Sequence, residues 1–361
     1  MAATPLERLV TRLSFAASQA GRVAWYAGHG AAMRRAVKRI DAQYDSKYPG
    51  TRPQIRKPRG AVPSSRRMLA DIAALLKRDL DNVEAGLYPP PADSDGGLPA
   101  RLATSRAFFA DVPEVARRRR ERGHQEVRRE TGAAKRPRYY QQNFHFQSGG
   151  WMTPESARLY DMQVDVLFTG SADAMRRQAL VPMAEELAGR DQRTLSYADI
   201  ACGTGSFLAQ VRRAFPRLPC LAVDLSEAYL GEARRRIGRT SIVRPAVAKA
   251  EALPFADGAL DLATCIFLFH ELPPNIRRLV AAEIGRVVKP GGLFIFVESL
   301  QTGDEPDYDG LLELFPQLFH EPYYASYMTT DVAKLFNNAG FELEETTHAV
   351  FSKIMRFRRV R

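Results

Sequence analysis

The stretch from residue 194 to residue 206 constrains the fold of this chain more than any other. A run with strand propensity, residues 195–200, is followed by Gly203 and Gly205. Glycine allows a sharp backbone turn and close approach of a ligand, and Ser206 is a good cap for a following helix. A strand, a glycine turn and a helix start predict a βα unit whose helix N-terminus can meet a ligand.

A second strand-like run, residues 220–224, ends in Asp224, which lies 19 residues after Gly205. At about this spacing, a carboxylate at the end of the second strand of a nucleotide-binding unit reaches ribose hydroxyls. Asp224 is therefore the predicted ribose-binding residue. A short Gly-x-Gly turn alone is also common in structural loops, so the prediction depends on the rest of the chain.

Residues 199–205 resemble the first motif of the class I S-adenosylmethionine (SAM) methyltransferases, acid-x-x-x-Gly-x-Gly, with Ala201 where many members have a first glycine. Residues 248–255 are similar to the family's adenine-side segment. Residues 289–292, Lys-Pro-Gly-Gly, resemble its turn before the fifth strand. The resemblance covers about residues 140–361, and the small-molecule ubiquinone/menaquinone C-methyltransferases are the most similar group.

This resemblance implies an α/β fold with a Rossmann-like seven-stranded sheet, mostly parallel with an antiparallel C-terminal strand. The continuous apolar run at 259–267 suits the middle of a parallel sheet. We expect the methyltransferase domain at 139–361 and a basic, mainly helical extension with Pro/Gly-rich linkers at 1–138.

The resemblance also implies SAM as the cofactor. Gly203 and Gly205 would admit its methionine part, and Leu225 and Leu253 would flank its adenine. Lys249 departs from the family's usual acid, and a lysine cannot accept a hydrogen bond from the adenine amino group. The predicted cofactor-binding residues are Asp199, Ala201, Cys202, Gly203, Gly205, Asp224, Leu225, Ala250, Glu251, Leu253, Phe267, Tyr160 and Arg176.

Three side chains are candidate bases for an acceptor that must lose a proton. His270 and Glu298 are expected at the carboxyl ends of the fourth and fifth strands, where ligands bind in such sheets. A buried structural role for His270 fits the sequence equally well. His320 belongs to an acidic and aromatic insertion at 300–328, which either covers the acceptor or forms a surface loop with its own small cluster.

An aromatic and amide-rich segment, residues 139–151, precedes two predicted helices at 156–168 and 173–187. The segment is either a strand packed on the core or a cover over the active site. In the resembling family, helices at this place cover the SAM pocket. Tyr160 and Arg176 therefore either contact SAM or are ordinary helix-surface residues.

The net charge of +11 is unevenly distributed, because residues 1–150 contain 28 Lys and Arg against 14 Asp and Glu. A predicted helix at 5–40 either packs on the rest of the protein or contacts an anionic membrane surface. Nucleic-acid binding is disfavoured, since no nucleic-acid fold signature accompanies the arginine run at 117–122.

Three cysteines without paired spacing favour reduced thiols in a cytoplasmic protein and no metal site. The sequence contains no apolar run of about 18 residues, so no transmembrane helix is predicted.

The sequence thus predicts SAM-dependent methyl transfer to a small, lipophilic or aromatic acceptor. An RNA methyltransferase is an alternative, although residues 269–272, Phe-His-Glu-Leu, replace the Asn/Asp-Pro-Pro-Tyr-like segment expected there. A non-catalytic assembly factor of the same fold is suggested by Lys249 and the long extension. A dinucleotide dehydrogenase would share the glycine turn, but the Lys-Pro-Gly-Gly turn argues against it.

Overall fold

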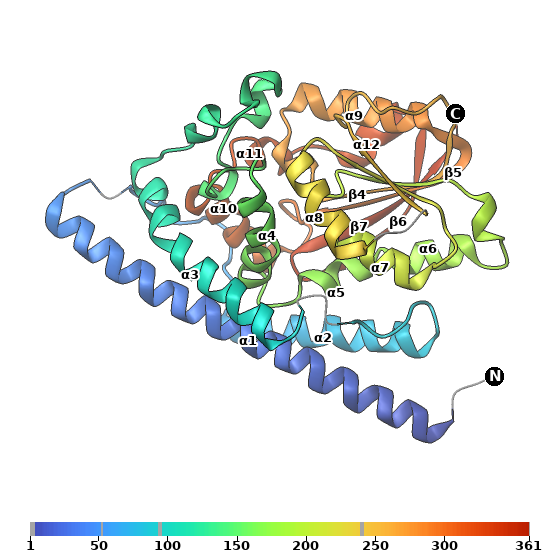
Figure 1. Cartoon of the computed structure of the whole chain (residues 1–361), viewed down its shortest axis with the longest axis horizontal. Coiled ribbons are helices and arrows are strands. Elements are labelled where there is room, and N and C mark those ends of the chain that lie inside the picture. The colour runs from blue at the N-terminus through green and yellow to red at the C-terminus, as the bar shows by residue number, and fades with distance from the viewer. Residues whose placement is uncertain (1–3, 52, 93–95, 239–241, 361) are drawn as a thin grey trace.

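A single seven-stranded sheet forms the centre of the protein (Figure 1). The computed structural model describes residues 4–51, 53–92, 96–238 and 242–360. Residues 1–3, 52, 93–95, 239–241 and 361, which belong to the predicted extension and methyltransferase domain, lie outside the described residues. The strands are β1 (Tyr197–Ile200), β2 (Cys220–Asp224), β3 (Val243–Val247), β4 (Leu260–Ile266), β5 (Val288–Ser299), β6 (Phe341–Ala349) and β7 (Ser352–Arg359).

The strand order is β3-β2-β1-β4-β5-β7-β6, and β7 runs antiparallel to both of its neighbours. The other pairings between neighbouring strands are parallel. This arrangement confirms the predicted Rossmann-like sheet with its antiparallel closing strand.

Helices bury both faces of the sheet, as the side chains of β5 illustrate. Leu293, Ile295 and Val297 pack in one core with residues of α5 (Ala172–Arg177), α6 (Leu180–Leu187) and α7 (Ser206–Ala214). Phe294 and Phe296 point to the opposite core, with α9 (Pro274–Val287) and α12 (Val332–Asn338). Because successive strand side chains alternate between faces, a strand covered on both sides is apolar on both sides, as residues 293–297 of β5 are.

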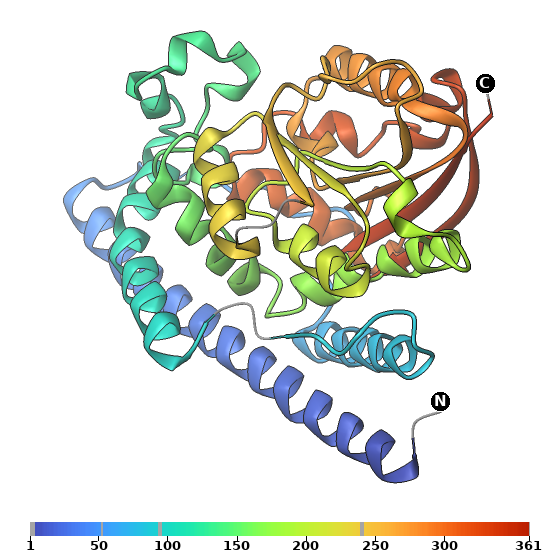
Figure 2. The same cartoon turned by 45° about the vertical axis from the view of Figure 1, so that its right-hand side comes forward.

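The N-terminal extension contributes three helices, α1 (Pro5–Lys47), α2 (Ser65–Glu84) and α3 (Leu98–Glu121), which pack beside the sheet domain (Figures 1 and 2). Thr4 and Glu7 form a capping box at the start of α1. An apolar cluster joins α1 and α3 to α4 (Pro154–Leu167), and its buried members are Tyr26, Phe108, Val112, Met162 and Val166.

The linker between α1 and α2 lies along α10 (Asp309–Leu318) of the predicted insertion, which also contains the short α11 (Tyr324–Tyr327). The Gly60 amide donates to Glu313 Oε1 at 3.0 Å, and the Gly310 amide donates to the Ala61 carbonyl at 2.7 Å. A Cβ atom on Gly310 would lie 2.3 Å from the Gly60 carbonyl oxygen, so this crossing requires glycine. The extension and the insertion therefore pack together.

Some local predictions were wrong. The helix predicted at 173–187 is interrupted between α5 and α6. Gly205, in a left-handed conformation, caps α7, whereas Ser206 is its first residue and donates its hydroxyl to Asp161 Oδ1 at 2.7 Å. Residues 289–292 lie within the bounds of β5, but the register with β4 passes from Leu260–Val288 to Leu262–Leu293, and Gly291 has a φ of +77°, so the predicted turn is an irregularity inside the strand.

The three cysteines are buried and free. Within the described ranges, no group of side chains is suited to hold a metal ion. No helix in the part of the chain that the structure describes is long and apolar enough to cross a bilayer.

Candidate cofactor and active site

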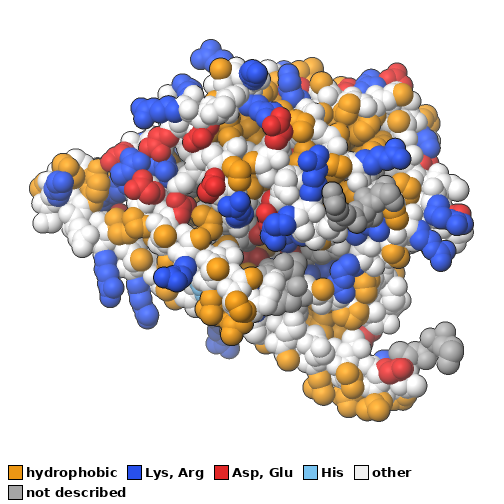
Figure 3. All heavy atoms as spheres, in the orientation of Figure 1, with side chains coloured by type: hydrophobic (Ala, Val, Ile, Leu, Met, Phe, Trp, Pro, Cys, Tyr) orange, Lys and Arg blue, Asp and Glu red, His pale blue; other side chains and the backbone are white. Residues whose placement is uncertain are grey.

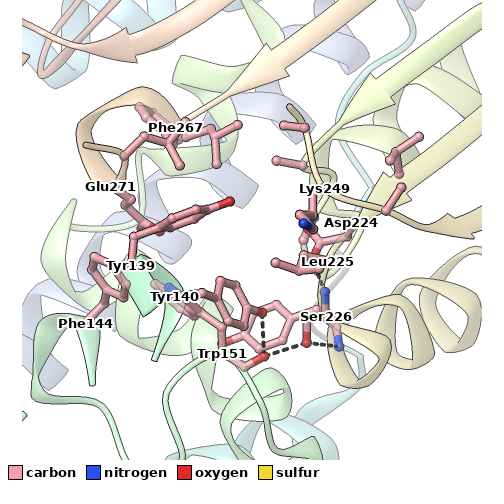
Figure 4. Close-up of a pocket in the computed structure, with 18 of the residues that line it drawn as sticks. Tyr139, Tyr140, Phe144, Trp151, Asp224, Leu225, Ser226, Lys249, Phe267 and Glu271 are labelled. Carbon is pink, nitrogen blue, oxygen red and sulfur yellow. Dashed lines mark hydrogen bonds between the residues drawn. The ribbon is translucent and has the colours of Figure 1, made fainter. Parts of the chain in front are cut away.

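A cavity of about 840 Å³, its open mouth included, lies beyond the carboxyl ends of β1, β2 and β4 (Figure 4). Ligands bind at this edge of parallel sheets because the loops after the strands diverge there. The residues that line it are Tyr139, Tyr140, Phe144, Trp151, Tyr160, Ala201, Gly203, Val223, Asp224, Leu225, Ser226, Tyr229, Ala248, Lys249, Ala250, Glu251, Ile266, Phe267, Leu268, Glu271 and Leu272.

The glycine turn after β1 presents its backbone to this cavity. Gly203 has a φ of +54°, and no atom lies within 4 Å of the place where its Cβ would be. Gly205 differs, because a Cβ there would lie 2.9 Å from the Cβ of Ala233 in α8 (Glu227–Ile237). The first glycine therefore leaves room at the cavity, whereas the second allows α7 and α8 to pack closely.

Asp224, at the end of β2, is held with its carboxylate at the cavity wall. Its Oδ2 accepts the Gly203 amide at 2.8 Å, and its Oδ1 accepts the Ser226 amide at 2.7 Å. Burial nevertheless raises the pKa of this carboxyl group. Each oxygen has a further lone pair that can accept a hydrogen bond from a ligand hydroxyl.

The aromatic segment at 139–151 closes the opposite side of the cavity in short 3₁₀ turns, so its interpretation as a strand was wrong (Figure 4). Tyr139 donates its hydroxyl to Glu251 Oε1 at 2.7 Å. The Trp151 carbonyl accepts the Tyr140 hydroxyl at 3.0 Å and the Ser226 hydroxyl at 2.5 Å. These bonds fix the segment to the loops after β2 and β3.

Asp161 of α4 holds that helix against the glycine turn. It accepts the Thr204 hydroxyl at 2.9 Å and the Ser206 hydroxyl at 2.7 Å, and it pairs with Arg236 of α8. Tyr160, one residue earlier, consequently lines the cavity.

A buried cluster of His270, Glu271 and Glu298 lies next to the cavity, at the carboxyl ends of β4 and β5. His270 Nδ1 is 2.8 Å from Glu298 Oε2, and His270 Nε2 is 3.8 Å from Glu271 Oε1. Burial alone would lower the pKa of His270, but the Glu298 carboxylate raises it to about 9. Burial raises the pKa of Glu271 to about 8. Glu271 lines the cavity, whereas His270 and Glu298 do not.

Comparison with known proteins places these features in a family. Residues 198–292 match the methyltransferase domain family. The demethylmenaquinone methyltransferase of Deinococcus radiodurans is 32% identical over 140 residues, which cover 38% of this chain and 55% of that enzyme. The malonyl-[acyl-carrier protein] O-methyltransferase of Alcanivorax borkumensis is 34% identical over 102 residues, covering 28% of this chain and 34% of that enzyme.

Residues 198–292 thus form a methyltransferase domain, and the chain is similar to class I SAM-dependent methyltransferases. It spans only about half of the length of the demethylmenaquinone methyltransferase named above. Among solved structures, the magnesium protoporphyrin IX methyltransferase of Synechocystis with bound SAH is 17% identical, with a TM-score of 0.40, over 53% of this chain and 87% of that chain.

SAM is the cofactor of this methyltransferase family, and the cavity residues fit it. The open space at Gly203 allows close approach to the backbone, and the Asp224 oxygens can accept ribose hydroxyls. Leu225 and Ala250 supply apolar wall for a purine ring, and Lys249 lies on the same wall.

Most of the residues predicted for cofactor binding line the cavity beyond the carboxyl ends of β1, β2 and β4, hereafter the cofactor cavity. Those that line it are Ala201, Gly203, Asp224, Leu225, Ala250, Glu251, Phe267 and Tyr160. Asp199, Cys202, Gly205, Leu253 and Arg176 are not among its lining residues. Asp199 accepts the Thr264 hydroxyl at 2.8 Å and burial raises its pKa to about 7. Arg176 pairs with Asp173 at 3.0 Å, and Leu253 packs in the core.

The third predicted base, His320, does not line the cavity at the strand ends. Its Nε2 is 2.7 Å from Gln142 Oε1, and its ring stacks on His124 at 4.2 Å between centroids. Burial lowers its pKa to about 4. Tyr229 was missed by the sequence prediction although it lines the cavity, because only the crossing of α8 with α4 brings it there.

Proposed function

We propose that this protein transfers the methyl group of SAM to a small, lipophilic or aromatic acceptor. The observation that carries the proposal is the cavity at the strand ends, where the Asp224 carboxylate faces an aromatic cover at 139–151. The likeness to a demethylmenaquinone methyltransferase supports an acceptor of this class.

When bound, SAM supplies a methyl group that is already activated for displacement. The chain's own residues then have to hold the reactants and exclude water, which the aromatic cover does. Glu271 is the proposed proton acceptor, because its carboxyl group lines the cavity. With a pKa of about 8, it becomes an effective base as the pH rises through that value. His270, held between Glu298 and Glu271, is a positioning residue, since a pKa of about 9 keeps it protonated at neutral pH.

The arrangement of the arginine run makes an RNA acceptor less suitable. Arg117 pairs with Glu114, Glu121 and Glu126, and Arg118 also pairs with Glu126. Their neighbours pair with acids of α1. Phosphate binding needs cations that can replace counterions, and these charges are already neutralised within the protein.

Calorimetric titration with S-adenosylhomocysteine tests the proposed cofactor site. Asp224→Ala should weaken binding by about 10- to 100-fold, because hydrogen bonds to a charged group contribute roughly 1.5–3 kcal/mol. Asp257→Ala is the control, since the Asp257 side chain is 82% exposed and pairs only with Arg286 among the described residues. If wild-type protein fails to bind, or if Asp224→Ala binds like Asp257→Ala, the proposal is wrong.

We also propose that α1 contacts an anionic membrane surface. Its first turns expose Leu6, Leu9, Val10 and Leu13, each more than half exposed. Further along, Arg34, Arg35, Lys38 and Arg39 are exposed. Arg35 follows Leu6 by 29 positions, about eight turns of 3.6 residues, so the two groups share one helix face. Figure 3 shows basic side chains projecting from α1 at the lower left and hydrophobic ones at its lower right end.

A further inference from the structure

A second cavity, of about 960 Å³ with its open mouth included, lies between the extension and the methyltransferase domain. Its walls come from α1, α3 and α4, which lie side by side in Figures 1 and 2, and from residues near the end of α10. The side chains are mainly apolar, with Val37, Phe108, Val112 and Phe319 as examples. Because α1 and α3 lie outside residues 198–292, this cavity is built by parts of the chain that the methyltransferase domain family does not cover.

Aromatic rings lie between this second cavity and the cofactor cavity. Tyr160 lines both. Its ring meets that of Trp151, which lines the cofactor cavity, edge to face at 5.2 Å between centroids. The Trp151 ring in turn lies 6.0 Å from the ring of His145, which lines the second cavity. A molecule in the second cavity would therefore lie one aromatic layer away from bound cofactor.

A polar pair marks one wall of the second cavity. His145 Nε2 lies 3.1 Å from Glu321 Oε1, and the Glu321 side chain is fully buried. Within the described ranges, neither Glu321 oxygen receives a hydrogen bond of good geometry. A buried carboxyl group without such bonds is costly unless it is protonated or gains a partner.

Burial favours the uncharged form of both members of this pair. Burial lowers the pKa of His145 to about 3 and raises that of Glu321 well above its usual range. His145 also has a φ of +53°, a conformation that non-glycine residues rarely adopt, and its amide donates to the His320 carbonyl at 3.2 Å. The backbone thus fixes a neutral imidazole at the cavity wall.

We propose that the second cavity binds the apolar part of the methyl acceptor, with the imidazole of His145 as the hydrogen-bonding partner of an uncharged hydroxyl or carbonyl group. This inference rests on the proposed function, and it assigns the acceptor subsite to the N-terminal extension. The expected ligand is a neutral molecule with one polar end and a hydrocarbon body, since most of the wall is apolar and its two charged side chains have partners within the protein. Asp111 accepts the Ser148 hydroxyl, and Arg119 pairs with Asp41.

Calorimetry with 4-hexylphenol and hexylbenzene tests the proposal, and S-adenosylhomocysteine is titrated in parallel. Wild-type protein should bind 4-hexylphenol in preference to hexylbenzene. Val112→Trp, which fills the cavity from α3, should weaken binding of both probes by about ten-fold or more. Leu102→Trp adds the same side chain at a position of α3 that is 50% exposed, and it should leave binding unchanged.

His145→Phe keeps a ring of similar shape but removes the polar partner. It should abolish the preference for the phenol while hexylbenzene still binds. The inference would be overturned if wild type and Val112→Trp bound each probe equally well. It would also be overturned if wild type did not bind 4-hexylphenol. If Val112→Trp does not fold, as a thermal melt would reveal, His145→Phe alone decides, and an unchanged phenol preference overturns it.

The parallel titration separates the two proposals. S-adenosylhomocysteine affinity that is unchanged in both variants supports distinct cofactor and acceptor cavities. If the protein bound 4-hexylphenol with the expected differences between variants but did not bind S-adenosylhomocysteine, the proposed function would be overturned, and with it the role of the second cavity in holding the methyl acceptor.

Discussion

His270 connects the carboxyl groups at the ends of β4 and β5. Its imidazole lies between Glu298, at 2.8 Å, and Glu271, at 3.8 Å, and only Glu271 lines the cofactor cavity. A buried Glu298 without its cationic partner would be an uncompensated charge, which proteins avoid. The histidine therefore has a structural role, and its role in the site stays a prediction.

The stability of the protein should fall as the pH rises above neutrality. The folded-state pKa of His270 is about 9, above its ordinary value of 6.5. The stabilisation from its protonation is therefore complete below pH 6.5 and is lost as the pH rises through 9. Thermal melts across this interval should show a decreasing Tm. Glu298→Gln, which removes the main cause of the raised pKa, should give a smaller decrease over the same interval, and an equal one would contradict this explanation.

At the residue scale, the sequence could predict what depends on local spacing. Asp224 and Gly203 were found because a strand end and a turn place them wherever such a unit forms. Arg176 and Leu253 were expected at the cofactor but do not line the cavity. Arg176 forms an ion pair with Asp173, and Leu253 packs in the core. Those partners come from packing that spacing does not encode.

At the element scale, periodicity located the strands and most helices, since each has its own repeat of buried positions. It could not show that the turns at 139–151 form the cover of the cavity, because that segment has no regular repeat. Nor could it show that the linker before α2 lies along α10, some 250 residues later, through the contact between Gly60 and Glu313. These associations depend on tertiary packing alone.

The buried contact between α2 and α5 should make the extension essential for stability. Asp79 is fully buried, and it accepts hydrogen bonds from Arg177 Nε at 3.0 Å and from the Tyr88 hydroxyl at 2.8 Å. Asp79→Ala should lower the free energy of unfolding by about 3–5 kcal/mol, because it leaves the Arg177 charge buried without a partner. Chemical denaturation measures this change.

The same helix provides the control for this prediction. Asp81 pairs with Lys77 one turn away, and both side chains are more than half exposed. Asp81→Ala should therefore change the free energy of unfolding by about 0.5 kcal/mol or less. If the two variants were equally stable, α2 would not be anchored through Asp79.

At the scale of the whole molecule, the charge of the extension divides into two parts. The arginine run in α3 is largely neutralised by acids on α1 and α3 and in the following turn. The exposed face of α1 keeps its basic residues beside an apolar end. The sequence revealed the excess of positive charge, but only the packing of α1 against α3 distinguishes paired charges from those open to a surface.

This arrangement predicts binding to anionic vesicles that depends on the first turns of α1. Wild-type protein should sediment with vesicles of phosphatidylcholine and phosphatidylserine, and less so as salt screens the basic residues. Leu9→Asp combined with Leu13→Asp should release most of it, because each leucine that leaves water contributes roughly 1.5–3 kcal/mol. Leu279→Asp, at a site on α9 that is 53% exposed, is the matched control and should sediment like wild type. Equal sedimentation of the α1 and α9 variants would mean that α1 does not insert its apolar end, and binding that persists with neutral vesicles would exclude a role for its basic face.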